Sequence, residues 1–124
     1  MTRLMNGEAM SYLLLIVEPT GQRHERGLEA GHAAYDSMIE YARSLKARGV
    51  LVGTNSLKSA GARLKVRGGE RSVVDGPFTE AKELVGGYFL LNVETRDEAL
   101  ALAGECPAAE WATVEVREIG PCYD

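Results

Sequence analysis

The chain has 124 residues, a formal net charge of −4, 45% hydrophobic residues and 26% charged residues. A domain of this size buries roughly two thirds of its unfolded surface, which is enough for one core and too little for two. The isoelectric point near 5.2, with no aromatic residues among the basic ones, disfavours nucleic-acid binding. No apolar run approaches the ~18 to 20 residues of a membrane span or the core of a signal peptide, so we expect a cytoplasmic protein without a membrane partner.

The N-terminal half predicts a loose segment, a strand and a long helix. Residues Met1–Ala9 are polar and unpatterned, and start-site choice or residues foreign to the native chain explain them equally well. We expect them to be disordered and to precede a single domain over residues 10–124. Residues Met10–Glu18 are apolar on both alternating faces, which predicts a central strand buried from both sides. After a polar loop, an apolar stripe at helical spacing predicts a helix from Gly27 to Arg48.

The C-terminal part predicts strands, a hairpin and a second helix. The expected elements are a strand over Val50–Ala60, a hairpin of Ala62–Arg67 and Arg71–Asp75, a helical turn begun by Thr79, a two-sided apolar strand over Gly87–Glu94, a helix from the capping box Thr95-Arg96-Asp97-Glu98 to Gly104, and a strand over Trp111–Ile119. In the last strand, Trp111 is expected on the same face as Thr113.

This β-α-β-β-α-β order with an extra hairpin predicts an α+β ferredoxin-like sandwich, in which both helices cover one face of an antiparallel sheet. The strands near Leu14 and Leu90 are apolar on both sides, yet two helices can cover one side only. A bare sheet face would exceed the apolar patch that monomers tolerate, so we expect a homodimer in which two such faces meet.

The segment from Val74, VDGPFTEAKELVGGYFLLNVETRDEALALAGECPAAEWATVEVREIG, together with YLLLIVE from Tyr12, resembles the DGPF branch of the YCII-related (YciI-like) proteins. The resemblance covers Met10 to about Pro121, and Asp75-Gly76-Pro77-Phe78 is its most specific part. It implies a dimeric α/β barrel of ferredoxin-like subunits and an active site built around a histidine and an aspartate. It also implies an association with extracytoplasmic-function sigma factors, whereas no general substrate is established for the family.

Three residues are candidates for acid–base catalysis. Asp75 matches the aspartate of the motif, and its carboxylate either stabilises the turn before Gly76-Pro77 or acts as a general acid or base. His32 lies one helical turn from Asp36, so the two can form a pair that faces a cleft or solvent. His24 lies in the polar loop before the helix and either covers a pocket or is exposed.

Three further residues are candidates for substrate binding. Glu115 and Arg117 share the polar face of the last strand and would supply polar groups to a pocket between two sheets, or face solvent. Tyr88 lies on a central strand, where packing and ligand stacking are both open to it. No cluster has the spacing of a metal site and no glycine-rich motif fits a nucleotide, so we expect neither metal nor cofactor. Cys106 and Cys122 are expected to be free thiols.

The charge of the chain is strongly segregated. Residues 58–71 carry a net charge of +4, which leaves −8 for the rest of the chain. The basic hairpin is either a binding site for an anion or a solvated edge whose charges prevent another strand from pairing with it.

Two functional classes remain. The first is a cofactor-free acid–base enzyme of the isomerase or lyase type that acts on a small anionic molecule. The second is a non-catalytic ligand-binding or regulatory dimer that acts with a sigma factor.

Overall fold

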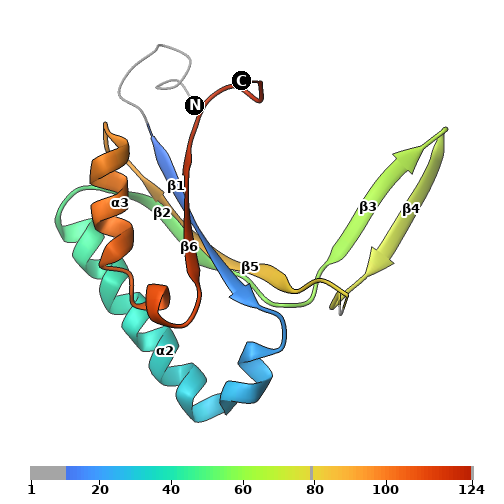
Figure 1. The fold of residues 1–124 in the computed structure, drawn as a ribbon, viewed down its shortest axis with the longest axis horizontal. Helices are drawn as coiled ribbons and strands as arrows, with labels where there is room; N and C mark the ends of the chain where they lie inside the picture. The colour runs from blue at the N-terminus through green and yellow to red at the C-terminus, as the bar shows by residue number, and fades with distance from the viewer. Residues whose placement is uncertain (1–10, 79, 124) are drawn as a thin grey trace.

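The computed structural model describes residues 11–78 and 80–123, so the expected loose segment Met1–Ala9 and the start of the expected turn at Thr79 lie outside the described residues. Four antiparallel strands form the main sheet in the order β2-β5-β1-β6. Their bounds are β1 Tyr12–Pro19, β2 Leu51–Ser56, β5 Glu83–Leu91 and β6 Thr113–Glu118. Helices α2 (Gln22–Ala47) and α3 (Arg96–Gly104) lie on the same side of this sheet (Figure 1). The architecture is therefore the expected α+β ferredoxin-like arrangement.

The core lies between the sheet and the two helices. Leu14 of β1, Leu91 of β5 and Leu45 of α2 are fully buried there. Along β1, Tyr12, Leu14 and Ile16 are buried and the alternate residues are half-buried, so the expected burial is complete on the helix face only. The two helices are joined by Tyr41 of α2, whose hydroxyl donates a hydrogen bond of 2.6 Å to the carbonyl oxygen of Leu102.

Helix α2 begins earlier than the sequence predicts. It starts at Gln22 rather than at Gly27, so the residues expected to form a loop make a first helical turn. Gly27 (φ 83°, ψ 171°) interrupts the helix and separates this turn from the long segment that follows. The long segment thus begins where the sequence predicts, and only the short turn before Gly27 was missed. The break leaves Arg23 and Arg26 on a turn at the C-terminal end of β1.

Other boundaries also differ from the prediction. Strand β5 begins at Glu83, four residues before the expected Gly87, and β2 ends at Ser56 instead of Ala60. A 3-10 helix η1 (Pro107–Glu110), not predicted from the sequence, precedes β6. Trp111 follows η1 and does not share a strand face with Thr113, because the last strand begins at Thr113. The expected capping box of α3 is confirmed, with both the Thr95 and the Glu98 side chains hydrogen-bonded to the opposite backbone amide.

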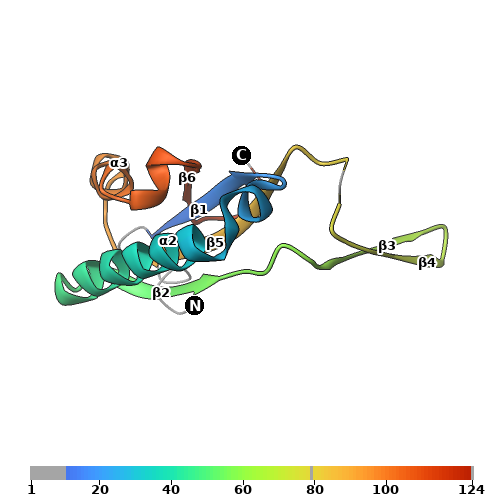
Figure 2. The same cartoon turned by 90° about the horizontal axis from the view of Figure 1, so that it is seen from below.

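The hairpin of β3 (Ala62–Arg67) and β4 (Glu70–Asp75) is a separate two-stranded sheet. Its turn, Gly68-Gly69, has positive φ at both residues, as a type I′ turn requires. The hairpin extends beyond the end of the main sheet and away from both helices (Figures 1 and 2). We call this hairpin the arm.

Candidate functional site

A cavity of about 410 Å³ lies between the first half of α2 and the sheet. This volume is within the range of small-molecule sites, about 300–1,000 Å³. Its apolar walls come from β1, β5 and α2 and include Ile16, Phe89, Met38, Ile39 and Ala42. Its polar lining includes Glu18, Arg23, Arg26, His32, Thr54, Ser56 and Trp111. The cavity thus combines an apolar surface with a group of polar side chains.

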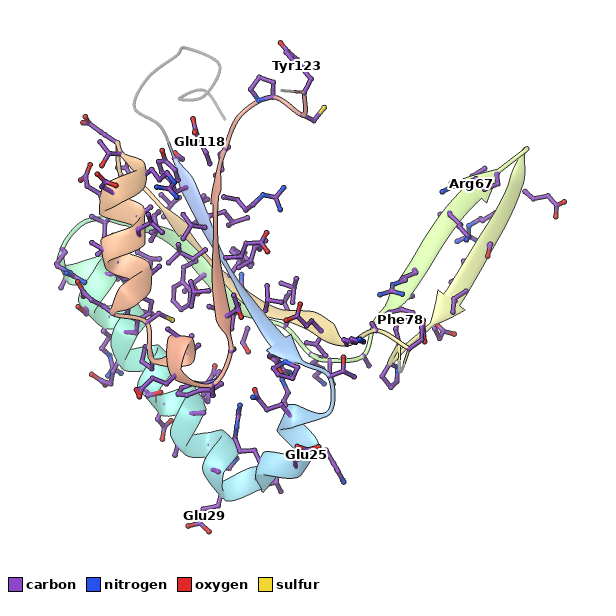
Figure 3. The ribbon with its side chains drawn as sticks, viewed as in Figure 1. Glu25, Glu29, Arg67, Phe78, Glu118 and Tyr123 are labelled. Carbon is purple, nitrogen blue, oxygen red and sulfur yellow. The ribbon has the colours of Figure 1, made fainter. Side chains whose placement is uncertain are left out.

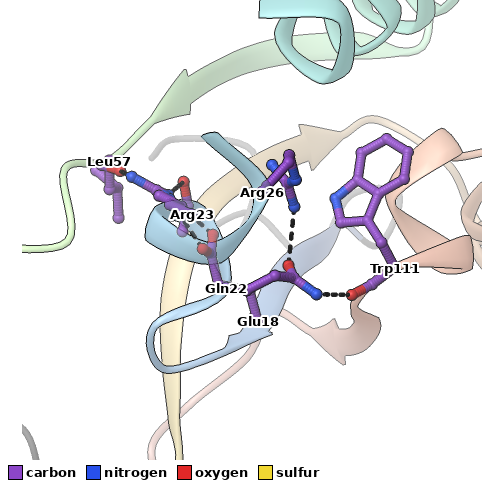
Figure 4. Close-up of polar contacts among 7 residues, drawn as sticks. Glu18, Gln22, Arg23, Arg26, Leu57 and Trp111 are labelled. Atoms are coloured by element: carbon purple, nitrogen blue, oxygen red, sulfur yellow. Dashed lines mark hydrogen bonds and ion pairs between the residues drawn. The ribbon is translucent and has the colours of Figure 1, made fainter. Parts of the chain in front are cut away.

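An ion pair between a buried carboxylate and a half-buried guanidinium lines the cavity at the end of β1. Arg23 donates two hydrogen bonds of 2.8 Å to the carboxylate of Glu18, one from Nε and one from Nη2 (Figure 4). Glu18 is only 7% exposed, so the paired arginine compensates for removing its charge from water. Arg23 also donates to the carbonyl oxygens of Leu57 at 2.8 Å and Gly86 at 3.3 Å. The pair therefore connects β1 and α2 to Leu57, which follows β2, and to Gly86, which lies in β5.

Gly86 makes this ion pair possible. A Cβ atom at this position would lie 1.8 Å from Oε1 of Glu18 and 2.6 Å from Nη2 of Arg23. Both distances are far below van der Waals contact, so a side chain at this position would require Glu18 and Arg23 to move from their present places. Gly86 lies inside β5, before the start of the strand predicted from the sequence, and there it allows close approach of two charged side chains.

Arg26 lies at the same end of the cavity without a carboxylate partner. Its Nη2 atom donates a hydrogen bond of 2.9 Å to Oε1 of Gln22, whose Nε2 donates to the carbonyl oxygen of Trp111 at 2.6 Å (Figure 4). The Arg26 guanidinium lies 5.5 Å from the centre of the Trp111 ring, in the range of a cation–π contact. Within residues 11–78 and 80–123, no acidic side chain forms an ion pair with Arg26. The cavity therefore holds one compensated cation, Arg23, and one cation available to an anionic ligand.

The two histidines occupy different places. His32 lines the cavity on the first full turn of α2 after Gly27. His24 is exposed on the short turn before Gly27 and does not line the cavity. Among the described contacts, no hydrogen bond or ion pair joins His32 to Asp36, although the helix brings them to neighbouring positions.

Asp75 lies at the end of β4, at the base of the arm, and is exposed. It does not line the cavity under α2, so one chain does not bring Asp75 and His32 into the same site. The motif around it forms a corner between the arm and the segment that leads to β5 instead. The Gly76 amide donates to the Gly61 carbonyl oxygen at 2.6 Å, the Gly76-Pro77 peptide is cis, and the Phe78 ring lies where a Gly76 side chain would be.

The three candidate substrate-binding residues lie on the opposite face of the sheet. Leu15 pairs with both Tyr88 and Glu115 in the register, so their side chains share the face without helices. Tyr88 accepts a hydrogen bond of 2.9 Å from Asn55 through its hydroxyl, and Arg117 pairs with Glu115 at 3.0 Å. The structure thus brings Tyr88, Glu115 and Arg117 to one surface, separated by the sheet from the cavity and His32.

Sequence reasoning missed the charged residues of the cavity. Glu18 ends an otherwise apolar strand, and Arg23 and Arg26 lie in a stretch that was interpreted as a loop. The available signal was a single carboxylate in phase with the buried residues Tyr12, Leu14 and Ile16, since such a group is rarely buried without a cation. An ion pair between Glu18 and one of the next arginines along the chain could therefore have been predicted, and with it the charged end of the cavity.

The described residues contain neither a cluster of metal ligands nor a helix that could span a membrane. Within residues 11–78 and 80–123, no group of three or more His, Cys, Asp or Glu side chains is arranged to hold a metal ion. Neither helix in that part of the chain is long and apolar enough to span a bilayer.

The fold and the cavity together define an α+β sandwich with a space of ligand size between one helix and the sheet. The chain matches the model of the YCII-related domain over residues 10–122 and therefore belongs to that family. It is also 40% identical over 63 residues to an uncharacterized protein of Rhizobium meliloti (strain 1021). That match covers 49% of this chain and 51% of the other protein, so the chain spans about half the length of the curated relative it matches.

Proposed function

We propose that the cavity under α2 binds a small anionic molecule with an apolar part, and that the protein catalyses acid–base chemistry of the isomerase or lyase type on it. The observation that carries the proposal is that Arg26 and His32 both line a cavity of about 410 Å³. Arg26 has no acidic partner within the described residues. The apolar walls would hold the hydrocarbon part of the ligand, and the Arg26 guanidinium would bind its carboxylate or phosphate.

His32 has the chemistry for proton transfer in this cavity. Histidine is the side chain best suited to exchange protons near neutral pH, and a general acid or base must lie within reach of the bound ligand. A substrate held by Arg26 would present the carbon next to its carbonyl group to His32. His32 would take a proton from that carbon and deliver it to a neighbouring atom, such as the carbonyl oxygen, so that the double bond moves, which is an isomerisation.

The remaining candidates enter the proposal through a second copy of the chain. We propose that the face that carries Leu15, Tyr88, Glu115 and Arg117 pairs with the same face of another chain, as in a dimeric barrel of the DGPF branch. Asp75 would then act at a site completed by the partner, and His24 would remain at its edge. Both roles require the dimer, whereas binding by Arg26 and His32 does not.

Trp111 provides a direct test of binding, because it is the single tryptophan of the chain and lines the cavity. Phenylpyruvate is a suitable probe, since it has a carboxylate, an aromatic group and an acidic carbon next to a carbonyl. We expect the tryptophan fluorescence to change as phenylpyruvate is added and to level off at saturation. The Arg26→Gln substitution should raise the dissociation constant about tenfold or more. Arg43→Gln is the matched control, because Arg43 lies on α2 with an exposed partner, Glu40, and outside the cavity lining.

Catalysis is tested on the same probe. In D₂O, exchange of the probe's acidic C–H protons for deuterium, followed by proton NMR, should be faster with protein than in buffer. His32→Gln should abolish this acceleration and leave binding close to wild type. Binding without acceleration would instead support the alternative, a non-catalytic ligand-binding or regulatory protein that acts with a sigma factor. No saturable fluorescence change with phenylpyruvate or with phenyl phosphate would reject the cavity as an anion site.

A further inference from the structure

The arm has the features of a segment that needs a surface to pack on. All of β3 and nearly all of β4 are exposed, and Leu64, Val66 and Val73 are 55%, 54% and 48% exposed. The register places these three residues on one face of the hairpin, with the basic residues of β3 on the other face. A lone two-stranded hairpin with such an apolar face is at best marginally stable in water. The arm of a single chain therefore lacks the contact that would stabilise it.

The base of the arm is nevertheless fixed. The Arg63 guanidinium lies 3.8 Å from the centre of the Phe78 ring and forms an ion pair of 3.7 Å with Glu80. The amide of Gly76 bonds the carbonyl oxygen of Gly61 across the two ends of the hairpin. Phe78 lies at this base, and Arg67 near the tip of the arm (Figure 3). The most specific motif of the sequence, residues 75–78, thus holds an exposed hairpin in a set direction.

That direction is toward the side of the sheet that lacks helices (Figure 1). The same side carries the half-buried Leu13, Leu15 and Leu90 of the central strands. A strand of six residues spans about 20 Å, while stacked sheets lie about 10 Å apart. The arm is therefore long enough to pass the edge of a second sheet packed on this face and to reach the helix layer behind it.

Charge identifies the partner surface. Residues 58–71 carry +4 and the rest of the chain carries −8, so a second copy of this chain presents the opposite charge to the arm. The acidic side chains Glu25 and Glu29 lie at the N-terminal end of α2, on the helix side of the sheet, whereas Arg67 near the tip of the arm lies on the other side (Figure 3). Within one chain the arm points away from this surface, whereas a second copy on the bare face would bring one within its reach.

We propose that the arm clasps a second copy of the chain, with the apolar face of Leu64, Val66 and Val73 packed against the partner and the basic residues near its acidic surface. The proposal rests on the dimer of the proposed function and adds a second interface to it. It also gives the DGPF motif a role, which is to hold the arm in the direction that meets the partner.

The test combines hydrogen–deuterium exchange with dimer affinity. Amides of residues 62–67 and 70–75 should exchange more slowly when the protein concentration is raised from the monomer to the dimer range. The double substitution Leu64→Thr/Val73→Thr keeps strand propensity and removes apolar contact, so it should raise the dimer dissociation constant about tenfold or more. Leu100→Thr, at an exposed leucine of α3, is the matched control and should leave the constant unchanged.

Each outcome decides one part of the proposal. A wild-type dimer whose arm exchanges at the same rate at all concentrations, and whose affinity is unchanged by the double substitution, overturns the clasp and leaves the dimer standing. A wild-type monomer at high micromolar concentration overturns both, while fluorescence binding at the cavity remains a separate result. Loss of arm protection in the double variant, with tryptophan fluorescence and the unfolding midpoint retained, supports the clasp and excludes misfolding.

Discussion

At the scale of single residues, Gly86 occupies a position where one methyl group breaks the link between β5, β1 and α2. In Gly86→Ala the new Cβ would meet the Glu18 carboxylate at 1.8 Å and force the Glu18–Arg23 pair apart. Separating a buried carboxylate from its cation leaves a charge without compensation. We expect the free energy of unfolding to fall by about 2–4 kcal/mol, measured by urea denaturation.

Gly104→Ala is the control for the loss of a glycine. No atom lies within 4 Å of a Cβ at this last residue of α3. The helix propensity of alanine is more favourable than that of glycine by up to about 1 kcal/mol. We expect this variant to be as stable as wild type or slightly more stable. Equal destabilisation of both variants would contradict the role given to the Gly86 contact.

The two cysteines should differ in reactivity. Burial raises the pKa of the Cys106 thiol, so at neutral pH a smaller fraction is the reactive thiolate, and access to it is also poor. Cys122 is exposed. We expect iodoacetamide to modify one thiol rapidly and the second only slowly or after unfolding, as followed by intact mass. Cys122→Ser should remove the rapid phase, and a rapid phase that persists in this variant would be incompatible with a buried Cys106.

At the scale of elements, a buried hydroxyl of α2 joins this helix to α3. Burial raises the pKa of Tyr41, so the hydroxyl stays protonated and donates to the Leu102 carbonyl oxygen. Tyr41→Phe keeps the edge-to-face contact with Phe89, whose ring centre is 5.1 Å away, and leaves the carbonyl without this donor. We expect a loss of about 1–3 kcal/mol in urea denaturation, with the same slope as wild type. A loss below 0.5 kcal/mol, on the order of an ordinary surface change, would show that water replaces the hydroxyl.

Elements with a strong local signal were predictable from the sequence. The central place of β1 in the sheet, the capping box at Thr95 and the two-glycine turn of the arm follow from periodicity and turn chemistry, and the structure confirms them. The first turn of α2 was not predicted, because Gly27 and the charged residues before it are typical of a loop. The missing turn carries Arg23 and Arg26, so the charged end of the cavity was missed with it.

The candidate site was predicted only in part for the same physical reason. His32 was selected on its helix, and it lines the cavity. Its neighbours there come from β1, β2, β5 and the segment after η1, and nothing local relates Glu18 to Gly86 or Arg26 to Trp111. Such relations depend on tertiary packing, which periodicity does not report. Asp75 was selected on its motif, and the structure places that motif at the base of the arm.

At the scale of the whole molecule, the sheet separates two surfaces with different proposed roles. One surface packs on the helices and holds the cavity, and the other carries Leu13, Leu15 and Leu90 with no helix over it. A substitution on the second surface should therefore affect assembly without affecting binding in the cavity. Ligand binding and assembly can therefore be changed independently by substitutions on opposite faces of the sheet.

Leu15→Lys places a charge in the middle of the bare face, between Tyr88 and Glu115. If two such faces pair, each dimer would bury two added ammonium groups, a cost of several kcal/mol per ion. We expect the variant to be a monomer in native mass spectrometry at a concentration where wild type is a dimer. Phenylpyruvate should still change its Trp111 fluorescence, because the Leu15 side chain points away from the cavity. Leu100→Lys adds the same charge on α3 and should leave assembly unchanged. A Leu15→Lys dimer as tight as wild type would mean that the bare face is not the interface, and the arm would then have to make the dimer by itself.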